Sequence, residues 1–177
     1  VNPSGKLTMT IPRNVGQVPI YYAHRATGRP QPGDEFQKFR SNYLDVPNSP
    51  LYPFGYGLSY TTFDYSDIKL DKRSFPAGGA LTASVTVTND GNLEGEEVVQ
   101  MYIHDVVADI TRPVKELKGF QKIRLKPGES RTVNFKITEE ELKFYNYNLD
   151  YVAVPGEFMV FIGTSSQDVK QAQFSFE

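Results

Sequence analysis

Hydrophobic and polar residues alternate in short runs along the last two thirds of the chain. Residues 81–88 alternate Leu, Ala and Val with Thr and Ser, so one side of this segment is apolar and the other is polar. A period of two is the geometry of a β-strand, whose successive side chains point to opposite faces of a sheet. The same alternation recurs at residues 99–103 and 133–137. We therefore predict half-buried antiparallel strands at these positions.

Turn signals separate these runs. Residues 89–92 (Asn-Asp-Gly-Asn) predict a turn, because these residue types tolerate positive φ. Residues 126–129 (Lys-Pro-Gly-Glu) have Pro and Gly at the central positions of a type II turn. Thr138 and Glu141 have the spacing of a capping box, which predicts a short helix that ends by Tyr145. Further strands are predicted at residues 63–70, 120–125, 151–154, 158–162 and 172–176.

The order of these elements predicts an all-β fold. Seven or eight short strands in residues 59–177 fit an immunoglobulin-like or fibronectin-III-like antiparallel β-sandwich. Within it, residues 155–157 (Pro-Gly-Glu) predict a hairpin connection, and residues 172–176 an edge strand.

The first third of the chain has a different pattern. Only residues 7–11 alternate, which predicts one strand whose partner sheet lies outside this chain. Residues 23–50 show no period and are interrupted by Gly and Pro, as in a linker or a functional loop. We therefore divide the chain into an irregular N-terminal extension, residues 1–58, and the sandwich, residues 59–177.

The join between these parts is rich in aromatic residues. Pro53 fixes its own φ, and Gly55 and Gly57 can adopt positive φ, so this segment should fold into a tight turn. So many rings are too apolar to remain in water, and we expect interdomain packing rather than a platform for sugars. The four rings are those of Tyr52, Phe54, Tyr56 and Tyr60.

Composition excludes several classes of function. The formal charge of −2 creates no general attraction for nucleic acid, so we interpret the basic residues between Arg112 and Lys126 as a solvated sheet face. No apolar run reaches the roughly 18 residues of a membrane-spanning helix. The chain has no cysteine, which excludes disulfides and thiolate metal sites. We predict no nucleic-acid or membrane partner, no metal and no cofactor. Because the chain begins with Val1 rather than Met, we expect a piece of a longer protein.

Several ordered motifs resemble one known family. The segments at residues 52–63, 112–120, 125–129 and 155–158 are similar, in this order, to the fibronectin-III-like C-terminal region of family 3 glycoside hydrolases, the β-glucosidase and β-xylosidase family. Residues 2–7 and 11–13 resemble the last strand of that family's preceding α/β domain. The likeness covers nearly the whole chain and is strongest to periplasmic bacterial β-glucosidases.

The resemblance implies a role without catalysis. In the family, the nucleophile is an aspartate of an upstream barrel, commonly followed by Trp, and this chain has no Trp. The acid/base is usually a glutamate of the next domain, so we transfer no catalytic residue to this chain. The implied partners are the upstream barrel and α/β domains of the same protein, and the implied substrate is a β-glucoside with terminal β-linked glucose. The implied location is periplasmic or secreted.

The acidic and histidine residues do not form a catalytic site by pattern. Residues 139–141 lie in the first turn of a helix, where the macrodipole lowers carboxyl pKa values, the wrong direction for a general acid. Glu94, Glu96 and Glu97 follow a turn and are expected in solvent. His24 and His104 are expected to be ordinary surface or junction residues.

We therefore expect a structural domain that supports the catalytic domains and positions linker residues near the substrate. The linker residues selected for this are Arg29, Arg40 and Tyr43. One alternative is a carbohydrate-binding module, for which the aromatic candidates in the sandwich are Tyr102, Tyr147 and Tyr151. Another is a fibronectin-type domain that binds a protein partner, since fold alone does not fix function.

Overall fold

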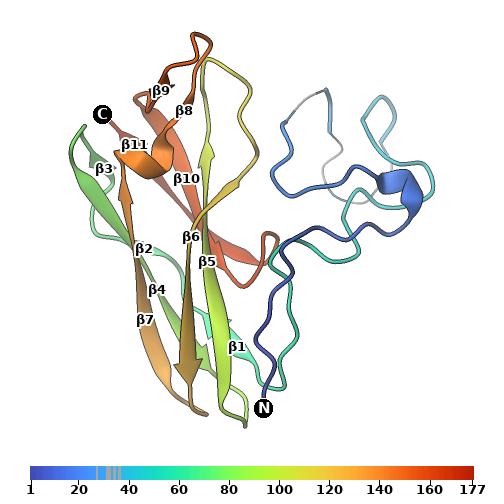
Figure 1. The fold of residues 1–177 in the computed structure, drawn as a ribbon, viewed down its shortest axis with the longest axis vertical. Helices are drawn as coiled ribbons and strands as arrows, with labels where there is room; N and C mark the ends of the chain where they lie inside the picture. The colour runs from blue at the N-terminus through green and yellow to red at the C-terminus, as the bar shows by residue number, and fades with distance from the viewer. Residues whose placement is uncertain (27, 31–32, 34, 36) are drawn as a thin grey trace.

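The computed structural model describes residues 1–26, 28–30, 33, 35 and 37–177. Two facing β-sheets form an elongated sandwich, and an irregular arm lies against one of them (Figure 1). We use the name arm for residues 1–58. The predicted all-β antiparallel sandwich is confirmed.

The first sheet is built around β4 (Ala80–Asn89). It pairs antiparallel with β7 (Ser130–Thr138) on one side and with the short strands β1 (Phe63–Tyr65) and β2 (Lys69–Leu70) on the other. The predicted strand at residues 63–70 is therefore two strands, separated by residues 66–68.

The second sheet has the order β3-β11-β10-β5-β6. These strands are β3 (Ser74–Phe75), β11 (Val169–Phe176), β10 (Gly156–Gly163), β5 (Gly95–Asp105) and β6 (Glu116–Leu125). Strand β11 is not the edge strand that the sequence predicted, since β3 pairs in parallel with its last two residues.

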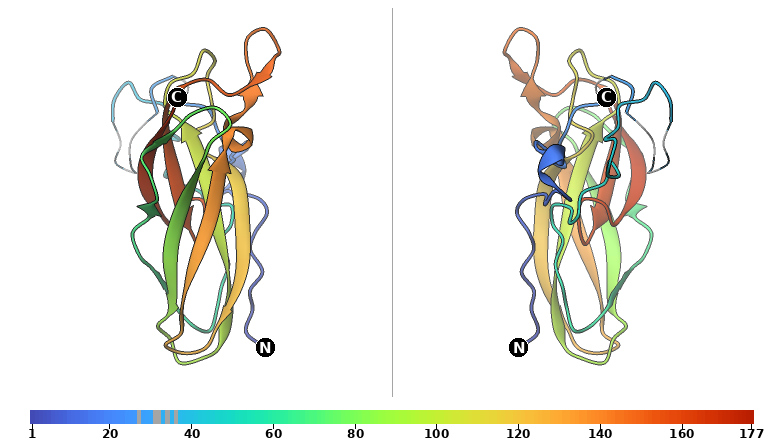
Figure 2. Two further views of the ribbon diagram at one scale, coloured as in Figure 1. Left: turned by 90° about the vertical axis from the view of Figure 1, so that its left-hand side faces the viewer. Right: turned by 90° about the vertical axis from the view of Figure 1, so that its right-hand side faces the viewer.

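Among the described residues, two strands and two helical turns lie outside these two large sheets. The strands β8 (Phe144–Tyr145) and β9 (Tyr151–Val152) form a hairpin that projects beyond one end of the sandwich (Figures 1 and 2). The predicted hairpin through residues 155–157 is therefore wrong, because β9 pairs with β8 while β10 pairs with β5 and β11. The helical turns are η1 (Val15–Gln17) and α1 (Glu139–Leu142).

The alternating residues form the core as predicted. Every second residue of β4 from Leu81 to Asn89 is buried, and the intervening Thr and Ser residues are only partly covered. The apolar residues of this row face a matching row of the second sheet. That row includes Val99, Met101, Ile103, Phe158, Val160, Ile162 and Phe174.

The predicted turn at residues 126–129 is confirmed by its geometry. Gly128 has φ +74°, and the Glu129 N–H donates to the Lys126 carbonyl at 2.9 Å. The helix α1 has both hydrogen bonds of the predicted capping box, and it ends at Leu142, within the predicted limit of Tyr145.

The turn after β4 has a different cause from the predicted one. Of the described non-glycine residues, only Phe39 and Leu149 have positive φ, so positive φ at Asn89 does not make this turn. Asn89 is instead buried. Its side-chain oxygen Oδ1 accepts from the Thr61 hydroxyl at 2.6 Å and from the Gly91 N–H at 3.1 Å. Its amide donates to the carbonyls of Leu93 and Leu125. This side chain closes the turn by satisfying four polar groups.

The arm contains the largest departure from the sequence prediction. Residues 7–11 form no strand; they pair back onto the aromatic segment of the same chain. The Leu7 N–H donates to Tyr56 O at 2.8 Å, and the Ile11 N–H donates to Tyr52 O at 2.9 Å. Residues 7–11 thus find a hydrogen-bonding partner within this chain.

Candidate functional site: the junction of the arm with the sandwich

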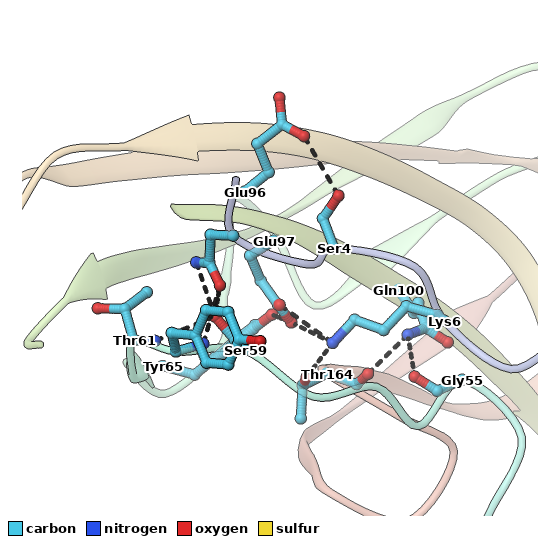
Figure 3. Close-up of polar contacts among 12 residues, drawn as sticks. Ser4, Lys6, Gly55, Ser59, Thr61, Tyr65, Glu96, Glu97, Gln100 and Thr164 are labelled. Carbon is cyan, nitrogen blue, oxygen red and sulfur yellow. Dashed lines mark hydrogen bonds and ion pairs between the residues drawn. The ribbon is translucent and has the colours of Figure 1, made fainter. Parts of the chain in front are cut away.

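A buried ion pair joins the arm to the sandwich. Lys6 of the arm lies with its Nζ 3.0 Å from Glu97 Oε2, at the start of β5 (Figure 3). The same ammonium donates to Thr164 Oγ1 at 2.8 Å. Glu97 is 3% exposed, so the prediction of a solvated residue is wrong. Lys6 of the arm bonds to this carboxylate, which lies on the same side of β5 as the core residues Val99 and Met101.

A second donor completes the shell of the Glu97 carboxylate. The Tyr65 hydroxyl donates to Glu97 Oε1 at 2.9 Å (Figure 3). Burial, followed by the negative charge of Glu97, raises the pKa of Tyr65 well above its ordinary value. The phenol therefore stays neutral and keeps its proton for this hydrogen bond. A buried carboxylate with both a cation and a neutral donor avoids most of the cost of losing its water.

Gln100 lies three residues after Glu97 on β5. Its side chain connects β5 to the arm and to the loop that contains Thr164. Its amide donates to Gly55 O at 3.2 Å and to Thr164 O at 2.6 Å (Figure 3). Its carbonyl oxygen accepts a hydrogen bond of 2.5 Å from the Tyr102 hydroxyl. Since all these groups are used, Gln100 holds the tight turn of the arm directly against the sheet.

The outer face of β5 is covered by aromatic rings of the arm. Gln100 and Tyr102 alternate with the core residues of β5 and so point away from the sandwich core, but Tyr102 is fully buried. Its ring meets Tyr22 edge-on at 5.7 Å, and Tyr22 stacks on Phe54 at 4.3 Å between ring centroids. Burial raises the pKa of Tyr102 above its ordinary value. Tyr102 therefore cannot serve as the exposed sugar-stacking residue considered from the sequence.

The two glycines of the aromatic turn act in different ways. Gly55 has φ +81°, as predicted, and a Cβ at this position would lie 2.8 Å from the side-chain carbon Cδ of Gln100. Gly57 has no positive φ, but a Cβ there would lie 2.5 Å from Gly5 O. The first glycine permits the turn, and the second permits the close approach of the opening residues.

The opening residues are also attached by neutral hydrogen bonds. Asn2 donates from its amide to Ser59 Oγ at 3.0 Å and accepts from the Tyr60 N–H at 2.8 Å. Ser4 donates to Glu96 at 3.2 Å (Figure 3). The pKa of Glu96 is lowered, chiefly because Lys122 donates a hydrogen bond to it.

The four aromatic residues predicted to lie between domains have different surroundings within this chain. Phe54 is half-buried against Tyr22, whereas Tyr52 stacks on Tyr56 at 5.0 Å and remains partly exposed. Tyr60 is 74% exposed. Only Phe54 of the four therefore has a ring contact with the cluster that covers β5.

The residues predicted to lie near a substrate belong to a lobe formed by residues 13–50. The Ser41 N–H donates to Arg29 O at 2.7 Å, which brings the exposed Arg29 and Arg40 into one region of the backbone. The Tyr43 hydroxyl donates to Gln17 O at 3.1 Å, and Tyr43 lines a groove of about 770 Å³.

Gln17 is a residue of this lobe that sequence reasoning missed. It is fully buried, accepts from the Arg13 N–H, and donates to Pro47 O at 2.7 Å. A buried glutamine in a segment without periodicity gives no pattern by which it could be selected.

Most of the basic residues near β6 are paired. Arg112 lies 2.6 Å from Glu116, Lys122 lies 2.7 Å from Glu96, and Arg124 lies 2.9 Å from Glu94. Burial lowers the pKa of Lys115, whose ammonium donates to Ser166 O. Acidic partners therefore neutralise much of this stripe, but Arg112 and Lys115 are partly buried, which the prediction of a solvated sheet face did not include.

The described part of the chain, residues 1–26, 28–30, 33, 35 and 37–177, contains no group of three or more His, Asp or Glu side chains suited to a metal ion. Within the same residues, no helix has the length and apolar character needed to cross a membrane. The arrangement of side chains at the junction is suited to holding two segments together.

Replacing Lys6 tests the buried ion pair. We expect Lys6→Met to lower the free energy of unfolding by about 3 kcal/mol, because Glu97 would keep its charge under cover without a cation. Urea denaturation measures this loss. Hydrogen exchange should quicken at the amides of Leu7 and Gly55, which bond across the arm. The matched control is Lys122→Met, which removes an exposed pair and should cost less than about 1 kcal/mol. Equal losses in both variants would contradict the assignment.

A pair of glycine substitutions separates crowding from backbone strain. Gly55 and Gly128 both have positive φ, but a Cβ at Gly128 meets nothing within 4 Å. Gly128→Ala should cost about 1 kcal/mol from strain alone. Gly55→Ala should cost about 3 kcal/mol, because the methyl group also displaces Gln100. Urea denaturation compares the two variants, and equal costs would show that the turn does not press on β5.

Comparison with known proteins agrees with this architecture. A model of the fibronectin type III-like domain matches residues 97–166. The chain is 56% identical over 173 residues to a periplasmic beta-glucosidase of Salmonella typhimurium, covering 98% of this chain and 23% of the relative. It is 47% identical to a putative beta-xylosidase of Formosa agariphila, covering 100% of this chain and 22% of the relative.

Solved structures show the same correspondence. The crystal structure of a beta-glucosidase from Listeria innocua in complex with isofagomine matches with a TM-score of 0.93 and 46% identity, covering 99% of this chain and 25% of that one. The Bifidobacterium adolescentis GH3 beta-glucosidase matches with a TM-score of 0.76 and 31% identity, covering 99% and 26%. The chain therefore spans about a quarter of the length of these relatives. Its fibronectin type III-like sandwich and these likenesses identify it as a fibronectin type III-like part of a protein similar to the β-glucosidases of glycoside hydrolase family 3.

Proposed function

We propose that the chain is a non-catalytic structural part of an enzyme that hydrolyses terminal β-linked glucose. The names of the relatives favour this reaction. The chain covers only a small share of their length, which favours a structural role for it. The partners would be the barrel and α/β domains of the same protein. The name of the Salmonella relative supports a periplasmic location.

The buried Lys6–Glu97 pair is the observation that supports this role most directly. It fixes the arm to β5 through a buried pair of charges and the hydrogen bonds of Thr164 and Tyr65 around it. A sandwich that holds a long irregular segment in one position is suited to presenting that segment to a larger body. The sandwich would thus act as a rigid support.

Apolar side chains on the arm indicate where that larger body would lie. Several are exposed although the arm itself is folded against the sandwich, and exposed apolar surface is often a contact surface for another domain. They are Met9, Val15, Val18, Leu44, Leu51 and Leu58. We propose that they, with Tyr52, Tyr56 and Tyr60, pack against the preceding domains. The division of the chain at residues 58 and 59 is part of the same proposal.

We further propose that the lobe approaches the substrate pocket. Arg29 and Arg40 have exposed side chains, and guanidinium groups are suited to hydrogen-bonding sugar hydroxyls. Tyr43 would contribute a half-buried ring whose position is fixed by Gln17.

Separating the chain from the rest of the enzyme tests the supporting role. The 177-residue chain alone should give no hydrolysis of an aryl β-glucoside above the buffer rate, and the longer protein should hydrolyse it. A chromogenic assay at equal molar concentrations measures both. Lys6→Met in the longer protein should shorten the half-life of activity at elevated temperature, because the support is loosened. Hydrolysis by the chain alone would contradict the proposal.

Kinetics in the longer protein test the position of the lobe. Arg40→Ala and Tyr43→Ala should each raise KM for a disaccharide about tenfold with a smaller change in kcat, since they would remove binding contacts away from the bond that is cut. The matched control is Arg124→Ala, which removes an exposed cation of the sandwich. Unchanged KM in both lobe variants would refute this part of the proposal.

A further inference from the structure

The β8–β9 hairpin presents an ordered aromatic surface that the proposed supporting role does not use. Its strands pair Tyr145 with Tyr151, and the two rings lie 5.0 Å apart between centroids. Tyr147, at the turn, is 85% exposed, and Leu149 beside it is 79% exposed. The hairpin stands beyond the end of the sandwich, away from the arm (Figures 1 and 2).

The base of this hairpin is firmly held. Phe144 is buried, and the guanidinium carbon of Arg112 lies 4.3 Å from the centroid of its ring. Arg112 is itself paired with Glu116 at 2.6 Å. The side that faces the sandwich is therefore fixed by packing and charge, while the opposite side is exposed.

The turn of the hairpin is also ordered. The Asn146 side chain accepts from the N–H groups of Asn148 and Asp150, both at 2.9 Å. The Asn146 and Asp150 backbones are joined at 3.0 Å, and Leu149 adopts φ +67°. Tyrosine rings on such a preorganised loop can bind a ligand with little loss of conformational entropy.

Two polar side chains close to the tyrosines in the sequence indicate what kind of ligand fits. Asn148 and Asp150 are exposed, and within the described residues neither side chain has a hydrogen-bond or ion-pair partner. An apolar protein surface that covered the rings would leave this amide and carboxylate buried without partners, which is costly. A sugar offers apolar C–H faces to the rings and hydroxyl donors to the amide and carboxylate. A sugar therefore satisfies both sets of groups.

We propose that the β8–β9 hairpin is a carbohydrate-binding site, separate from the lobe, for a β-linked glucan of two or more sugar rings. Tyr145, Tyr147 and Tyr151 stack on the sugar rings, and Asn148 and Asp150 hydrogen-bond to the hydroxyls. The choice of glucan rests on the proposed function, whereas the site itself rests on the hairpin. Such a site would keep a longer glucan near the enzyme.

Calorimetric titration of the 177-residue chain with laminari- and cello-oligosaccharides tests this site. We expect saturable binding with a dissociation constant in the millimolar range or tighter. Tyr145→Ala combined with Tyr147→Ala should weaken it at least about tenfold through loss of stacking. Tyr147→Ala alone should still weaken it severalfold, and its side chain is too exposed to matter for folding. The matched control is Tyr60→Ala. Tyr60 is also exposed but is not part of the hairpin, so its replacement should leave binding unchanged.

The outcomes separate this site from the proposed function. Absence of saturable binding, or equal binding by Tyr147→Ala and wild type, would overturn the hairpin site even if the longer protein hydrolyses aryl β-glucoside. Loss of that hydrolysis in the longer protein would overturn the proposed function even if the hairpin binds glucan. Hydrogen exchange at residues 145–151 in the longer protein provides a further test. Stronger protection there in the longer protein than in the 177-residue chain, both without sugar, would show that a neighbouring domain covers the hairpin, which would also overturn the site.

Discussion

The ion pair between Lys6 and Glu97 fixes the position of the arm on the sandwich. A carboxylate that is 3% exposed is tolerated only when its charge is balanced, and here an ammonium and a phenol supply the balance. If the arm left, Glu97 would regain water, but the aromatic face of β5 would become exposed at the same time. The charge and the aromatic rings thus favour the same docked arrangement.

This arrangement gives β5 two buried faces although the rest of the sandwich has one face toward solvent. The inner face contributes Val99, Met101 and Ile103 to the core between the sheets. The outer face contributes Gln100 and Tyr102 to a smaller core that the arm completes. Because the second core consists of oriented rings and hydrogen bonds, it fixes the direction of the arm as well as its attachment.

The sequence predicted the parts whose structure depends on local pattern. Alternation located β4, β5 and β7, and Pro127 with Gly128 located a turn whose geometry needs a glycine. Alternation gives the face to which a side chain points, but it cannot indicate what covers that face. For that reason Tyr102 was considered for sugar binding although it is buried. Glu97 was expected in solvent because it follows a turn, and the two-residue strands β3 and β8 were missed. Lys6 gave no signal, since a lone lysine in an irregular segment is ordinarily a surface residue.

The same covering of β5 explains why the hairpin is the informative aromatic surface. Three tyrosines were considered from the sequence for sugar binding. Tyr102 is buried at the junction of the arm with the sandwich, while Tyr147 and Tyr151 are exposed on one ordered hairpin. The ring of Tyr145, which the sequence argument did not select, joins them because β8 and β9 pair in register. Exposed tyrosines on a mobile loop would lose entropy on meeting a ligand, whereas these are held by Asn146 and by the packing of Phe144. An exposed apolar surface that is also ordered is maintained at a cost in solubility, and binding is the physical reason that best accounts for it.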